Sequence, residues 1–169
     1  EPYWRQSVNL PTLEKLSSDI ETEVCIVGGG IAGITTAYEL TQAGVKVILI
    51  DADQLLNGTT GHTTAKVTAQ HGLIYDEFIN HFGVEKAKLY YEANTDAFHY
   101  IKNLVSKRRI DCDFKEQDAI IYSINDEYDQ KVRKEYEAYE RLGIPRELTR
   151  EIPFSIETQS VLTMKEQAQ

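Results

Sequence analysis

Three glycines and an aspartate are the residues whose types and spacing are most specific for a chemical task. Gly28, Gly30 and Gly33 follow a short apolar run, residues 23–27, and form the pattern G-x-G-x-x-G. In this pattern the first glycine permits a sharp turn, the second lets the backbone approach a pyrophosphate, and the third lets a helix pack close to a strand. Asp51 comes eighteen positions after Gly33. Its carboxylate can accept hydrogen bonds from an adenosine ribose and would repel a 2′-phosphate, which favours NAD or FAD over NADP.

The residues around the glycines predict a strand, a helix and a second strand. Residues 23–27 are rich in β-branched side chains, as expected of a buried parallel strand, so Cys25 should be buried. Residues 31–43 have the apolar spacing of a helix, with Gly44 at the position of a C-cap, and residues 45–50 predict the second strand. A βαβ unit of this kind places its two strands parallel to each other.

The start of the predicted helix is the expected position of the pyrophosphate. Backbone amides near Ile31 and Ala32 have no partner within the helix and lie at the positive end of its dipole, where an anion is stabilised. Asp51 and the adjacent Ala52 would then lie near the adenosine ribose. The simpler alternative is that the glycines only shape a turn and that Asp51 only ends a strand. The sequence of strand, helix, strand and acidic residue favours the nucleotide interpretation.

The composition argues against several classes of protein. The chain has 169 residues, of which 41% are hydrophobic and 27% charged, as is typical of a folded domain. A net charge of −9 argues against a nucleic-acid partner, and no apolar run approaches the ~20 residues of a membrane-spanning helix. No secretory signal is visible, and Cys25 and Cys112 belong to no paired pattern, so we expect a cytoplasmic protein.

The remainder of the chain predicts an N-terminal arm and a mixed second half. Residues 1–21 are expected to form an arm with a short helical turn near residues 13–17. Apolar spacing and capping residues predict four further elements: a helix over 84–108, an antiparallel hairpin of 114–117 with 119–124, a helix over 126–142 capped by Asn125 and ended by Gly143, and a strand over 160–164.

A family resemblance rests on residues 23–51 and on the loop that follows them. Together with Gly58-Thr59-Thr60-Gly61-His62-Thr63-Thr64-Ala65, they resemble the start of the D-amino-acid oxidase and glycine/sarcosine oxidase superfamily of FAD-dependent oxidoreductases. More narrowly, Pro2-Tyr3-Trp4-Arg5, the same loop continued to Lys66, and His71-Gly72 are similar to a bacterial branch. Full-length members of that branch carry a C-terminal Rieske [2Fe-2S] domain.

The resemblance implies FAD as the cofactor, with the polar loop wrapping the flavin's diphosphate and ribityl portion. The loop residues that it places near the cofactor are Thr59, Thr60, His62, Thr63, Thr64 and Lys66. An exposed loop lysine is an equal interpretation of Lys66. In some related dimethylglycine and sarcosine dehydrogenases a similar loop carries a histidine joined covalently to the flavin, whereas here Gly61 replaces the aromatic residue before it. A covalent link, a noncovalent contact and an exposed histidine therefore remain alternatives for His62.

The expected fold is α/β: a Rossmann-like FAD-binding βαβ unit with added helices and a short antiparallel hairpin, incomplete without the rest of a parent chain. We expect an arm over residues 1–21, the βαβ unit and flavin loop over 22–83, and a truncated segment over 84–169 that leads into the substrate domain. The cysteine and histidine ligands of a Rieske cluster are not in this sequence, so the [2Fe-2S] centre would belong to the missing C-terminal part. We identify no metal ligands in this chain.

The expected function is that of the N-terminal segment of an FAD-dependent oxidoreductase that oxidises a small amine or amino acid. This segment would bind the ADP moiety of FAD, and no acid or base in it is identified as catalytic. Two alternatives are kept: an NAD-binding dehydrogenase module, which would lack flavin absorbance, and a noncatalytic domain that retains the nucleotide fold.

Overall fold

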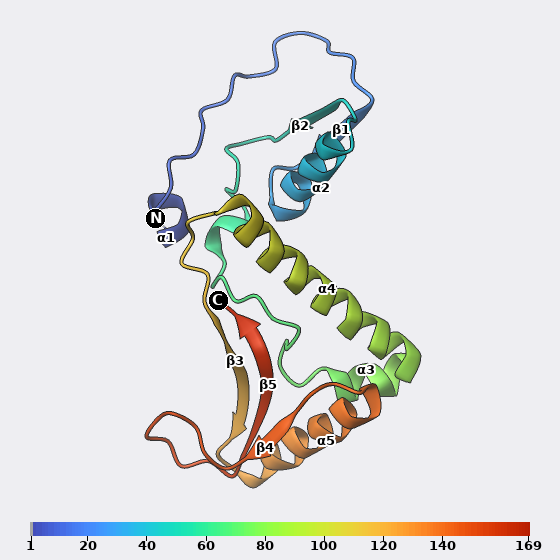
Figure 1. Ribbon diagram of the computed structural model, residues 1–169, viewed down its shortest axis with the longest axis vertical. Helices are drawn as coiled ribbons and strands as arrows, with labels where there is room; N and C mark the ends of the chain where they lie inside the picture. The colour runs from blue at the N-terminus through green and yellow to red at the C-terminus, as the bar shows by residue number, and fades with distance from the viewer. Residues whose placement is uncertain (1) are drawn as a thin grey trace. The chain divides into compact units, whose positions relative to one another are not determined.

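The computed structural model describes residues 2–169, which divide into two compact units, one ending at Thr64 and one running from Ala65 to Gln169. The first contains helix α1 (Tyr3–Gln6), strand β1 (Val24–Val27), helix α2 (Ile31–Gln42), strand β2 (Val47–Ile50) and the 3-10 helix η1 (Thr59–His62). The second contains, in chain order, α3 (Tyr75–Phe82), α4 (Val84–Arg108), β3 (Glu116–Ser123), α5 (Asp126–Leu142), β4 (Glu147–Thr149) and β5 (Ser160–Ala168) (Figure 1).

The first unit is built on the predicted strand, helix and strand. β1 and β2 pair in parallel, with Val24 opposite Val47 and Val27 opposite Ile50. α2 lies against the two strands (Figure 1) and is followed by Gly44, whose φ of +81° allows the chain to leave the helix in a conformation that other residues rarely adopt. The predicted βαβ unit is therefore present.

The predicted burial of Cys25 is wrong. Ile26 faces α2, because a Cβ added to Gly33 of that helix would lie 3.4 Å from the Ile26 Cγ2 atom. Side chains alternate along a strand, so Cys25 and Val27 project from the opposite face. Cys25 is exposed and Val27 is 80% exposed, since no described residue of this unit covers that face of the sheet.

The predicted helical turn at residues 13–17 is also wrong. The arm forms its helix earlier, at α1, and residues 13–17 have no regular structure. Leu13 and Leu16 are 61% and 62% exposed, so no apolar contact stabilises a turn there. α1 instead has hydrogen-bond partners in the loop that contains η1, which are described below.

The second unit contains an antiparallel sheet with the strand order β3-β5-β4. The hairpin predicted over residues 114–124 is wrong, because β3 is one strand that pairs with β5 from the end of the chain. The predicted bend near Asp118 corresponds to a shift in register between Gln117 and Ala119. A local turn was predicted, whereas the paired residues of β3 and β5 lie 37 to 52 positions apart in sequence, from Ser123 with Ser160 to Glu116 with Ala168.

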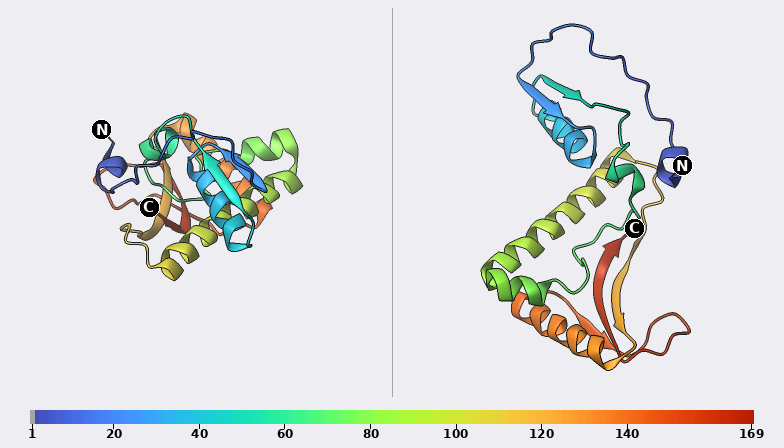
Figure 2. Two further views of the ribbon diagram at one scale, coloured as in Figure 1. Left: turned by 90° about the horizontal axis from the view of Figure 1, so that it is seen from above. Right: turned by 180° about the vertical axis from the view of Figure 1, so that it is seen from behind.

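The two long helices of this unit begin and end where the sequence predicts. α5 is capped by the Asn125 side chain, which accepts a hydrogen bond from the Tyr128 amide at 3.0 Å, and Gly143 ends it with a φ of +72°. α3, which has contacts with both α4 and α5 (Figure 2), was not predicted, and neither was β4. Within the described residues, no helix combines the length and the apolar character needed to cross a lipid bilayer.

A buried carboxylate joins α5 to the start of α3. Glu135 is 0% exposed, and its oxygens accept hydrogen bonds from the amides of Ile74, Tyr75 and Asp76 at 2.9–3.1 Å. The residue before α3 is Ile74, which offers no capping side chain, so Glu135 supplies the acceptor and the negative charge that a helix N-terminus favours. Burial raises the pKa of the Glu135 carboxyl, and the three amide hydrogen bonds offset part of that rise.

We predict that Glu135→Ala lowers the free energy of unfolding by about 3 kcal/mol, because it leaves three amides at the start of α3 without an acceptor. Glu137→Ala is the matched control, since Glu137 lies exposed on the same helix. Denaturant unfolding of the full-length protein measures both. Equal unfolding midpoints for the two variants would show that the cap does not stabilise the fold.

Candidate functional site

Close packing shapes the turn between β1 and α2. The Gly28 amide donates to the Ile50 carbonyl at 2.8 Å. Gly28 has a φ of +108°, a backbone conformation that residues other than glycine rarely adopt. A Cβ added to Gly33 would lie 1.8 Å from the Gly28 carbonyl oxygen. The helix therefore begins as close to the strand as a backbone allows, and this requires glycine at position 33.

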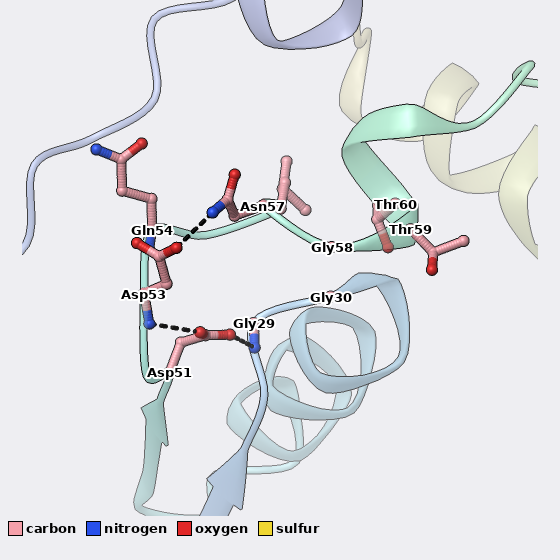
Figure 3. A pocket seen from close by; sticks show the side chains of 10 residues that line it. Gly29, Gly30, Asp51, Asp53, Gln54, Asn57, Gly58, Thr59 and Thr60 are labelled. Atoms are coloured by element: carbon pink, nitrogen blue, oxygen red, sulfur yellow. Dashed lines mark hydrogen bonds between the residues drawn. The ribbon is translucent and has the colours of Figure 1, made fainter. Parts of the chain in front are cut away.

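Asp51 at the end of β2 points at this turn. Its Oδ2 atom accepts a hydrogen bond from the Gly29 amide at 2.5 Å, and its Oδ1 atom accepts one from the Asp53 amide at 2.9 Å (Figure 3). The hydrogen bond from Gly29, together with those from Asp53 and Ala52, holds the pKa of the Asp51 carboxyl below its ordinary value. The side chain is exposed and ionised at neutral pH, and a carboxylate has more acceptor positions than these amides occupy.

An open pocket of about 330 Å³ lies between the glycine turn and the segment that follows β2. Figure 3 shows Asp51 on its floor, Gly30 at the start of α2, and Thr59 and Thr60 on the facing segment. The residues that line it are Gly29, Gly30, Asp51, Asp53, Gln54, Leu56, Asn57, Gly58, Thr59 and Thr60.

The loop after β2 reaches the first turn of α2. The Thr60 Oγ1 atom accepts a hydrogen bond from the Ile31 amide at 3.0 Å, one of the amides that have no partner within the helix. A Cβ added to Gly30, the residue that precedes the helix, would lie 3.4 Å from the same hydroxyl. A hydroxyl and a helix N-terminus thus meet at one side of the pocket, a combination that suits an anionic group.

The structure brings together only some of the predicted site residues. Gly30, Asp51, Thr59 and Thr60 line the pocket, and Gly28, Ile31 and Gly33 form the turn beside it. The other predicted residues that are not among its lining are Ala32, Ala52, His62, Thr63, Thr64 and Lys66.

His62 and Lys66 are not among the residues that line the pocket. The His62 ring is exposed, and its Nδ1 atom lies 2.9 Å from the Gly58 carbonyl oxygen within η1. Lys66 belongs to the second unit. Within residues 2–169, no group of three or more His, Cys, Asp or Glu side chains is arranged to hold a metal ion.

Six lining residues were missed by the sequence analysis: Gly29, Asp53, Gln54, Leu56, Asn57 and Gly58. Gly29 could have been found, because it lies between two motif glycines, and a Cβ there would lie 2.4 Å from the Leu55 Cδ2 atom. The adjacent Asn57 and Gly58 are typical of a turn, which places them on the surface without indicating a ligand. Asp53 and Gln54 lie outside the spacing of the dinucleotide-binding motif, so no pattern in the sequence marks them as site residues.

Parallel strands, a glycine turn at a helix N-terminus and a carboxylate after the second strand are the features of a dinucleotide-binding βαβ fold. Comparison with known proteins identifies the family. A sequence model described as FAD dependent oxidoreductase matches residues 23–157. The chain belongs to this FAD-dependent oxidoreductase family, as the resemblance in its sequence indicated.

Relatives and solved structures agree with this assignment. The chain is 55% identical over all of its 169 residues to YhfW of Bacillus subtilis, which is named a Rieske 2Fe-2S iron-sulfur protein, and covers 33% of it. It is 24% identical over 142 residues to gamma-glutamylputrescine oxidoreductase of Escherichia coli, covering 83% of this chain and 33% of that protein. The structure of L-amino acid deaminase from Proteus vulgaris matches 95% of this chain and 37% of its own, with a TM-score of 0.66 at 16% identity.

These comparisons confirm the predicted α/β fold class and the resemblance to a branch with a Rieske-named member. Because the sequence identity to the deaminase is only 16%, the similarity between the two structures shows a shared fold and no more. The chain spans about a third of the length of the relatives that it matches.

We predict that Gly33→Ala lowers the free energy of unfolding of the first unit by about 3 kcal/mol, because the added methyl would overlap the Gly28 backbone, which no rotamer change can relieve. Gly58→Ala is the control, since its φ is −86° and nothing lies within 4 Å of an added Cβ. Thermal unfolding of the full-length protein, followed for the first unit by amide hydrogen exchange, measures the effect. If amide hydrogen exchange in α2 is the same in Gly33→Ala as in the wild type, the packing argument is contradicted.

Proposed function

We propose that the first unit binds the ADP half of FAD and that the whole protein is an FAD-dependent oxidoreductase acting on a small amine or amino acid. The observation that carries the proposal is the direction of Asp51. Its ionised carboxylate points from the end of β2 to the amide of Gly29, at the floor of a pocket that also contains the start of α2. Family membership supports FAD as the dinucleotide.

Each group of residues in the pocket suits one part of the ADP moiety. We assign the pyrophosphate to Gly30 and the Ile31 amide, where the absence of a Cβ and the helix dipole favour a close anion. The Thr60 hydroxyl, now bonded to that amide, is a further phosphate ligand in this proposal. Asp51 would accept a hydrogen bond from the ribose hydroxyls at an acceptor position that its amide donors leave free.

The chemistry of oxidation would come from the cofactor, since a flavin accepts a hydride from the carbon of a C–N bond. The substrate class is supported by the names of relatives, which include an oxidoreductase of gamma-glutamylputrescine and a deaminase of L-amino acids. In this proposal residues 1–21 are an arm, residues 22–83 contain the βαβ unit and flavin loop, and residues 84–169 lead into a substrate domain. The [2Fe-2S] group is assigned to the part of the protein outside this chain.

A cytoplasmic location and the absence of a nucleic-acid partner are further parts of the proposal. They rest on the net charge of −9, which disfavours contact with phosphate backbones, and on two unpaired cysteines, which suit a reducing compartment.

We predict that Asp51→Arg and Gly30→Val each abolish the retention of FAD by the full-length protein. The first change replaces the ribose acceptor by a donor of opposite charge, and the second puts a branched side chain where the pyrophosphate would lie. Asp19→Arg is the matched control, because it makes the same charge change at an exposed position of the arm. Flavin absorbance of the purified proteins measures retention.

Flavin absorbance also separates the alternatives. Retention of flavin by both Asp51→Arg and Gly30→Val would contradict the assignment of the pocket. A wild-type protein that binds NAD and no flavin would instead support the dehydrogenase module. Acid precipitation of the wild-type protein tests His62, since a covalently attached flavin would remain with the pellet.

A further inference from the structure

Helix α1 is hydrogen-bonded to both ends of the loop that lines the pocket. The Arg5 guanidinium donates from Nη1 to the Asn57 Oδ1 atom and from Nη2 to the Gln54 Oε1 atom at 3.0 Å. The Trp4 indole donates to the Thr63 carbonyl at 2.7 Å. A helix of four residues therefore bridges positions 54 to 63, more than forty residues further along the chain.

The Arg5 contact continues as a series of hydrogen bonds to the glycine turn. A guanidinium has only donors, so it takes the oxygen of the Asn57 amide and leaves the NH2 group to donate to the Asp53 carboxylate. The Asp53 amide donates to Asp51, which accepts from Gly29 through its other oxygen. Arg5 is thus connected to the Asp51 carboxylate through two lining residues of the pocket.

Gly61 packs closely against both the Leu56 backbone and the Arg5 side chain. A Cβ at Gly61 would lie 3.1 Å from the Arg5 Cδ atom, 3.2 Å from its Cγ atom and 2.2 Å from the Leu56 carbonyl oxygen. The overlap with the Leu56 carbonyl by itself requires glycine at this position, and an added Cβ would also press on the aliphatic part of Arg5.

We propose that α1 is a strap that holds the dinucleotide pocket in its binding conformation and that Arg5 is its positioning residue. The inference rests on the proposed function for the identity of the ligand. Apart from η1, the segment between β2 and the end of the unit has no regular structure of its own. The Arg5 guanidinium orients two of its amide side chains, Gln54 and Asn57. Asn57 in turn orients the Asp53 side chain by a hydrogen bond.

The test compares Arg5→Gln with Lys15→Gln in the full-length protein. Both changes remove one positive charge from the arm, and Lys15 is exposed. We expect Arg5→Gln to raise amide hydrogen exchange over residues 53–57 of the apoprotein. We expect it also to weaken FAD binding by about tenfold, the size of one net hydrogen bond. Lys15→Gln should match the wild type in both measurements.

Asn57→Ala distinguishes positioning from a general loss of stability. If Arg5 acts through Asn57, Arg5→Gln adds little to Asn57→Ala, and the double variant binds FAD as the single Asn57→Ala variant does. Arg5→Lys keeps the charge but cannot span Asn57 and Gln54 as a fork, so we expect intermediate FAD affinity. If the double variant loses FAD affinity by the product of the two single losses, Arg5 does not act through Asn57 and the proposal is overturned.

The outcomes separate the two proposals. If wild-type protein takes up no FAD, the proposed function fails, and hydrogen exchange over residues 53–57 still tests the strap. If FAD binds but Arg5→Gln matches Lys15→Gln in exchange or in affinity, the strap is overturned and the proposed function stands.

Discussion

The first unit depends on a contact between two pieces of backbone. The Gly28 carbonyl oxygen occupies the space where position 33 would carry a Cβ, so α2 starts almost in contact with the end of β1. This approach directs the helix N-terminus at the point where β2 also ends, because the two strands are parallel and in register from Val24 and Val47 onward. An amide of the turn and a carboxylate from β2 then lie within one hydrogen bond of each other. The pocket follows from that approach, and the loop after β2 closes it.

The elements that could be predicted from the sequence are those determined by neighbouring residues. The βαβ unit follows from local periodicity and glycine spacing, and the bounds of α4 and α5 follow from apolar spacing and from Gly143. α3 was missed because its N-terminal acceptor is Glu135, sixty residues from Tyr75 in sequence. The predicted hairpin was wrong because the strand that pairs with β3 is also distant in sequence, at the end of the chain. The predicted burial of Cys25 was wrong because the composition of a strand does not show whether both faces of its sheet are covered.

Four of the ten residues that line the pocket were predicted, and there is a physical reason why the other six were not. Gly30 and Asp51 obey a spacing set by the geometry of a nucleotide, so their types and positions are both informative. Asn57 and Gln54 are surface amides whose orientation comes from Arg5, about fifty residues earlier. No local pattern could connect them, although the resemblance of the opening residues to a known branch did single out the segment that contains Trp4 and Arg5.

The Glu135 carboxylate has a consequence for the order in which the second unit forms. Ribosomal synthesis releases α3 before the acceptor for its first amides exists, and α4 and β3 must emerge in the interval. Closing a loop of this length carries an entropic cost that local helix formation does not. α3 should therefore become stable only when α5 arrives, so that folding of this half is cooperative and late rather than progressive along the nascent chain.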